Sequence, residues 1–215
     1  MGKIVLATII ISGSAKWLLK VGGNKEKWYG SDRIFMYVMT VFGAMTVNYS
    51  EQCTEYGWVV SNLRLLAGCL LAGGLLSAAY MDRRNCWVYN YVWWWCLPWA
   101  GILGLTAGGG FHGIVAVLVF VMLQQLLFSR MYGKADCHAF SVCALAECGN
   151  AVGMVGFLLQ MFLSVVLLTI VQLFRGNVTP RGRLRESQPF IPYIITAFFS
   201  VTFLESVFRT TYIYA

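Results

Sequence analysis

The chain has 215 residues, of which 59% are hydrophobic and only 12% are charged. Soluble domains carry about 25% charged residues, and disordered chains are poor in hydrophobic ones, so the composition excludes both classes. The formal net charge of +7 is typical of basic cytoplasmic loops in a membrane protein and needs no nucleic-acid partner. We therefore expect an integral membrane protein whose surroundings are a lipid bilayer.

Eight apolar segments follow one another along the chain, and a helix crosses a bilayer with about 17–25 such residues. The sixth contains Glu147 and Asn150, so we expect it to face protein or water and not lipid. The first resembles a signal peptide, but its apolar run continues to Leu19, which favours a membrane segment. The segments predict an all-α fold, a polytopic membrane helix bundle with about eight transmembrane segments, at residues 4–19, 34–49, 65–81, 87–105, 111–128, 138–151, 152–174 and 190–207.

The seven cysteines include no Cys-x-x-Cys pair, so the spacing typical of zinc and thioredoxin-type sites is absent. Most of them lie in or beside apolar segments, where a thiol behaves as a small hydrophobic group. We expect no metal ion and no cofactor.

Basic residues gather in alternate loops, and the loops between them carry little positive charge. The positive-inside rule places basic loops in the cytoplasm, which puts both termini outside. Arg64 and Arg209 fit this scheme poorly, because both would lie at the outer face. The basic clusters are Lys20, Lys25, Lys27 and Arg33; Arg83 and Arg84; Arg130 and Lys134; and Arg175, Arg181, Arg183 and Arg185.

Two of the three aspartates lie at ends of apolar segments. Asp82 ends the third segment and Asp136 precedes the sixth, whereas Asp32 lies in a basic loop and is expected to be an ordinary charge. Two crossings separate Asp82 from Asp136, so both carboxylates reach one face of the membrane, and by charge it is the cytoplasmic one. Two carboxyl groups at a water-accessible site can share one proton. The ionised one can draw a proton from water, and the protonated one can donate to the carbonyl that the water attacks.

Around these residues the sequence resembles the type IV prepilin peptidase family, membrane aspartyl proteases of the GxGD type. The family's first motif is an Asp, a short basic stretch and then Ile-Pro-Asn; here Asp82 is followed by two arginines and, at the matching offset, by Val88-Tyr89-Asn90. The second motif is Gly-x-Gly-Asp-x-Lys, and residues 133–138 match it except that Ala135 and His138 replace the second Gly and the Lys.

A third motif, Pro-Phe-x-Pro at the start of the family's last helix, matches residues 189–192, and the resemblance extends over about residues 65–207. It implies a six-helix protease core over 58–215, preceded by an N-terminal accessory hairpin over 1–57. The catalytic pair it implies is Asp82 and Asp136. The supporting residues are Gly133, Lys134, Ala135, His138, Asn90, Arg83, Arg84, Pro189 and Pro192.

The resemblance also implies the activity, namely cleavage of the basic leader peptide of a prepilin or pseudopilin at the cytoplasmic face of a bacterial inner membrane. Long members of the family also methylate the new N-terminus and carry paired Cys-x-x-Cys motifs; this chain has none, so we expect peptidase activity without methylation. Two alternatives stay open. One is a transporter component in which Asp82, Asp136 and Glu147 relay protons, and the other is a catalytically inactive relative acting in pilus or secretion assembly, for which Ala135 is the main hint.

Overall fold

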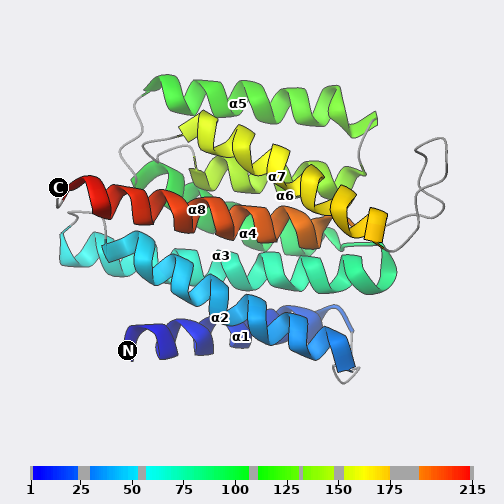
Figure 1. The fold of residues 1–215 in the computed structure, drawn as a ribbon, viewed down its shortest axis with the longest axis horizontal. Helices are drawn as coiled ribbons and strands as arrows, with labels where there is room; N and C mark the ends of the chain where they lie inside the picture. Colours follow the sequence, from blue (N-terminus) through cyan, green and yellow to red (C-terminus); the bar gives the residue numbers. More distant parts are fainter. Residues whose placement is uncertain are drawn as a thin grey trace.

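The computed structural model describes residues 2–23, 30–52, 57–106, 111–130, 133–147, 153–174 and 189–213. In these ranges the chain forms eight α-helices, one short 3₁₀ helix (Phe128–Arg130) and no strand, which confirms the all-helical class. The helices run back and forth along one long axis (Figure 1). Their bounds are α1 Gly2–Val21, α2 Gly30–Gln52, α3 Trp58–Asn85, α4 Asn90–Thr106, α5 Phe111–Leu126, α6 Lys134–Glu147, α7 Gly153–Phe174 and α8 Ile191–Ile213.

Four stretches of the described chain are long and apolar enough to cross a membrane: Gly2–Val21, Trp58–Asn85, Val155–Phe174 and Ile191–Phe208. Apolar side chains also cover the outside of the bundle, including Leu158, Phe162 and Leu173 on α7. Both observations indicate a membrane protein. The other four predicted spans form helices at the expected places, and their crossing of the bilayer stays a prediction.

The long helix α3 lies at the centre, with α1, α2, α4 and α8 packed around it. Glycines on α3 allow close approach, as small residues do between membrane helices. A methyl group at Gly73 would lie 2.9 Å from the carbonyl oxygen of Ile11 on α1, and one at Gly74 would lie 2.5 Å from Cys96 Sγ on α4. The predicted accessory helices α1 and α2 thus pack directly on the predicted core, and their accessory role stays a prediction.

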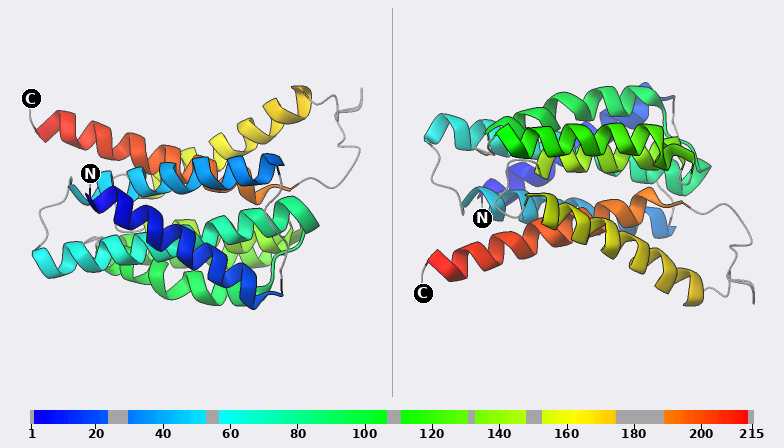
Figure 2. Two further views of the ribbon diagram at one scale, coloured as in Figure 1. Left: turned by 90° about the horizontal axis from the view of Figure 1, so that it is seen from below. Right: turned by 90° about the horizontal axis from the view of Figure 1, so that it is seen from above.

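Apart from α1, which runs obliquely across them, the helices form two layers, with α3 to α6 in one and α2, α7 and α8 in the other (Figure 2). The N-terminal end of α1 and the C-terminal end of α8 lie at one end of the long axis, and the C-terminal end of α3 and the N-terminal ends of α6 and α8 lie at the opposite end (Figure 1). We call the end that holds Asp82 and Asp136 the aspartate end, and the opposite end the terminal end.

Candidate active site

Asp82 lies one turn before the end of α3. The helix stops because Cys86 adopts a left-handed conformation with φ 49°, and the Cys86 N–H donates back to the carbonyl oxygen of Asp82 at 2.8 Å. The side chain of Asp82 is 7% exposed. Its Oδ2 accepts a hydrogen bond of 2.9 Å from the backbone N–H of Ile191, the first residue of α8.

This hydrogen bond joins two of the motifs that the sequence analysis identified separately. The first N–H groups of a helix have no partner within the helix, and Asp82 supplies an acceptor to α8 from a different helix. Pro192 has no N–H and occupies the second position of α8, where the missing donor does no harm. Phe190 is buried and packs edge-on against Phe140 of α6, with ring centroids 5.8 Å apart. The Pro-Phe-x-Pro segment therefore links α8 to both aspartate-bearing helices.

Asp136 lies in the first turn of α6, which begins four residues earlier than the predicted segment. Its Oδ2 accepts a hydrogen bond of 3.2 Å from the backbone N–H of Gly133, the residue before the helix. This is one half of a capping box, in which an acidic side chain in the first turn reaches back to the N-cap N–H. A methyl group at Gly133 would lie 3.1 Å from Asp136 Oδ2, so the glycine leaves room for the carboxyl.

The two carboxyl groups interact electrostatically. Asp136 lies before residue 138, where the predicted membrane segment begins. Its pKa is raised first by burial and second by the negative charge of Asp82, whereas the Gly133 hydrogen bond lowers it. A carboxyl beside a negative charge keeps its proton to a higher pH. The structure therefore brings the predicted pair to one end of the bundle, from α3 and α6.

Arg83 and Arg84 point toward Asp32 on α2. The Arg83 Nε atom lies 2.8 Å from Asp32 Oδ1, and the Arg84 Nε atom lies 3.4 Å from Asp32 Oδ2. The Arg83 guanidinium also lies over the ring of Phe35, 5.1 Å from its centroid. The expectation that Asp32 is an ordinary loop charge was wrong, because α2 begins at Gly30 and places this residue in its first turn, where it holds both arginines.

Of the other predicted supporting residues, some pack against neighbouring helices and some are exposed. His138 lies beside α4 and α5, with its Nδ1 3.4 Å from Gln125 Nε2 and its ring centroid 6.0 Å from that of Trp93. Ala135 is partly buried against the core. Lys134 and Asn90 are exposed, and Pro189 is partly buried. Outside the described residues lie Lys25, Lys27, Glu55, Tyr132, Asn150, Gln188 and the arginines at 175, 181, 183 and 185.

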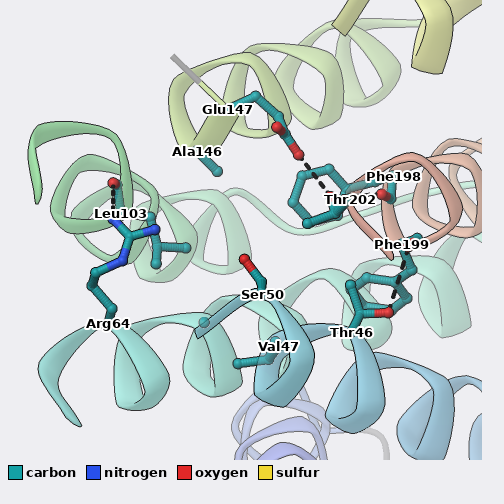
Figure 3. Close-up of a pocket in the computed structure, with 11 residues that line it drawn as sticks. Thr46, Val47, Ser50, Arg64, Leu103, Ala146, Glu147, Phe198, Phe199 and Thr202 are labelled. Atoms are coloured by element: carbon teal, nitrogen blue, oxygen red, sulfur yellow. Dashed lines mark hydrogen bonds between the residues drawn. The ribbon is translucent and has the colours of Figure 1, made fainter. Parts of the chain in front are cut away.

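A second polar cluster, at the terminal end, was not identified as a site by the sequence. Arg64, which fitted the charge pattern poorly, is 4% exposed and lies in the wall of a small pocket that also contains Glu147, 3% exposed (Figure 3). Glu147 is thus buried in protein, as expected for its segment. Arg64 lies 18 residues before Asp82 on the same helix, about 27 Å at 1.5 Å per residue, so the pocket is remote from the aspartates.

Among the described residues, no three His, Cys, Asp or Glu side chains gather as a metal site would require. No protein-family model, no curated protein and no solved structure matches the chain. The chemistry of the site is therefore argued from its own residues.

Proposed function

We propose that the chain is a membrane aspartyl endopeptidase that uses Asp82 and Asp136 to add water to a peptide bond. The observation that carries the proposal is that these two carboxyls, from the end of α3 and the start of α6, lie at the same end of the bundle, where the charge of Asp82 raises the pKa of Asp136. A third motif of the same resemblance, at residues 189–192, is hydrogen-bonded to one of them. Three separate sequence signals therefore coincide in space.

In this mechanism Asp136 is the acid and Asp82 the base. The raised pKa of Asp136 favours its protonated form to a higher pH than usual, and in that form it can donate to the carbonyl oxygen of the scissile bond. Ionised Asp82 takes a proton from water, and the water oxygen bonds to the carbonyl carbon. The tetrahedral diol then collapses: one diol hydroxyl returns its proton to Asp136, the carbon–nitrogen bond breaks, and the proton held by Asp82 leaves on the amine. No covalent enzyme intermediate forms, and the pair returns to its starting state with one shared proton.

The substrate that we propose is the leader peptide of a prepilin or pseudopilin, by resemblance to the prepilin peptidases. Such a leader is basic, and the apolar helix that follows it lies in the bilayer, which would bring the scissile bond to a membrane face. Both aspartates lie near the ends of their helices and not at the middles. A peptide bond at the membrane face would be within reach of such positions. The proposed location is the cytoplasmic face of a bacterial inner membrane, and the proposed product is unmethylated.

Co-expression with a prepilin-like substrate tests the proposal. Asp82→Asn and Asp136→Asn should each leave the substrate uncut, while the wild type shortens it by the length of the leader. Glu147→Gln is a matched control, since it removes a buried carboxylate from the same helix as Asp136, 11 residues away or about 16 Å, and it should cut normally. Cleavage by either aspartate variant at the wild-type level would exclude the proposed pair.

A catalytically inactive relative is the second candidate, and one observation favours it. Each aspartate accepts a backbone hydrogen bond at a helix start, so each has a structural use that requires no catalysis. Purified wild-type protein distinguishes the candidates: an inactive relative binds a prepilin-like substrate and leaves it intact under every condition in which a known prepilin peptidase cuts it.

A further inference from the structure

Helix α2 exposes a narrow row of apolar side chains on the outside of the bundle. Its other faces pack against α1, α3 and α8, whereas Ile34, Tyr37, Val38, Val41 and Met45 are exposed. Their spacing of three and four residues places them on one face of the helix. We call these five side chains the α2 stripe.

The length of the α2 stripe corresponds to one leaflet of a bilayer. From Ile34 to Met45 the helix rises about 16 Å, at 1.5 Å per residue. The hydrocarbon core of a bilayer is about 30 Å thick, so one leaflet contributes about 15 Å. An acyl chain that starts beside Ile34 would therefore be covered by the stripe along most of its length.

Positive charge lies at one end of the α2 stripe, where the helix begins at the aspartate end (Figure 1). Arg33 directly precedes the stripe, is exposed, and makes no ion pair with the part of the chain that the structure describes. Its neighbour Asp32 contacts both Arg83 and Arg84. Three arginines and one aspartate leave a formal charge of +2 on these four side chains.

This charge favours a phosphate group that carries no ammonium. Guanidinium groups bind phosphate well, because several N–H donors meet its oxygens at once. Asp82, the other acid near the end of α3, is buried and directed toward α8, so it offers little opposition at the surface. A free phosphate ion would use the arginines and leave the α2 stripe uncovered, whereas a phospholipid would use both features.

We propose that α2 binds one anionic phospholipid, with its phosphate beside Arg33 and one acyl chain along the α2 stripe. The charges of Arg83 and Arg84, held next to Arg33 by Asp32, add to the attraction. The inference does not rest on the proposed peptidase activity, because binding needs neither catalytic carboxyl. It assigns a partner to an exposed helix face and a role to Arg33 that the peptidase mechanism does not supply.

Native mass spectrometry of the purified full chain in neutral detergent tests the inference, with phosphatidylglycerol or phosphatidylcholine of the same acyl chains added. The wild type should bind one phosphatidylglycerol several-fold more tightly than phosphatidylcholine, whose ammonium the arginines repel. Glycerol phosphate, which has no acyl chain, should bind much more weakly than either lipid. Arg33→Gln should weaken phosphatidylglycerol binding about fivefold, which corresponds to about 1 kcal/mol for one basic side chain at an anionic lipid surface.

Matched controls separate this site from lipid that coats the whole bundle. Lys3→Gln removes an exposed basic side chain at the terminal end and should leave binding unchanged. Val41→Ser puts a hydroxyl into the α2 stripe and should weaken binding, whereas Val165→Ser makes the same change on α7 and should not; the two valines are 46% and 42% exposed.

All four of these positions are exposed, so the variants should fold, and their unfolding midpoints without added lipid check this. Equal affinity for the two lipids would overturn the inference. So would binding of glycerol phosphate as tight as that of the lipid, which would indicate a site for soluble anions. An equal effect of Arg33→Gln and Lys3→Gln, or of the two valine variants, would also overturn it.

Discussion

Replacing Asp82 with alanine or with asparagine separates the two roles that its carboxyl has in the structure. One role is structural, because Oδ2 accepts the Ile191 N–H at the start of α8, at 2.9 Å and in a buried position. The other is the proposed role as the base that activates water. Alanine removes both functions, whereas asparagine keeps a side-chain oxygen that can accept the Ile191 hydrogen bond but cannot take a proton from water.

The expected magnitudes differ between the two variants. In Asp82→Ala the buried Ile191 N–H has lost its acceptor, which costs about 1–3 kcal/mol, similar to the loss of a helix N-cap. Asn and Asp cap helices about equally well, so we expect Asp82→Asn to lie within about 0.5 kcal/mol of the wild type. For a chain of this length a loss of 1 kcal/mol lowers the unfolding midpoint by about 2–4 °C. Both variants should lose at least about 100-fold in cleavage rate, the usual minimum for a general acid or base.

Unfolding in detergent and cleavage of a prepilin-like substrate by the same preparations would measure both quantities. The reasoning about the site would be refuted by an asparagine variant that cuts at the wild-type rate, because the capping role alone would then account for Asp82. The reasoning about α8 would be refuted by an alanine variant as stable as the asparagine variant.

Four further predictions concern the same two polar sites. Because the pKa of Asp136 is raised, Asp136 stays protonated to a higher pH than an ordinary aspartate. Cleavage should therefore fall as the pH rises through the raised pKa, and the stability that this proton contributes should fall with it. Asp82→Asn removes a neighbouring negative charge, so infrared absorption of the protonated Asp136 carboxyl should disappear at a lower pH than in the wild type, and an unchanged titration would contradict the coupling. Gly133→Ala places a methyl 3.1 Å from Asp136 Oδ2 and should reduce cleavage several-fold with little change in the unfolding midpoint. Thr202→Val removes the hydroxyl that donates to buried Glu147 and should lower stability by about 1–3 kcal/mol without affecting cleavage; full stability of this variant would show that the bond contributes nothing.

The local properties of the chain were readable from the sequence. Hydrophobic runs predicted the eight helices because a helix in a bilayer satisfies its own backbone hydrogen bonds and needs only apolar side chains outside. Counting crossings placed Asp82 and Asp136 on one face, and the scarcity of acids made them conspicuous. Helix starts were predicted less well: α2 and α6 both begin four residues before the predicted segments, and each gains an aspartate in its first turn.

Contacts between helices needed the tertiary structure. Periodicity and charge fix which face of the membrane a residue reaches but not its distance from a residue on another helix. The sequence therefore gave no sign that Asp82 caps α8, that Asp32 and not Asp82 holds the two arginines, or that Arg64 and Glu147, 83 residues apart in the numbering, line one pocket. Such pairings depend on how close the backbones come; Gly73 and Gly74 on α3, for example, let α1 and α4 approach closely. Composition alone predicted a membrane protein, and the long apolar helices agree with it; packing around α3 decided which of its few charges meet.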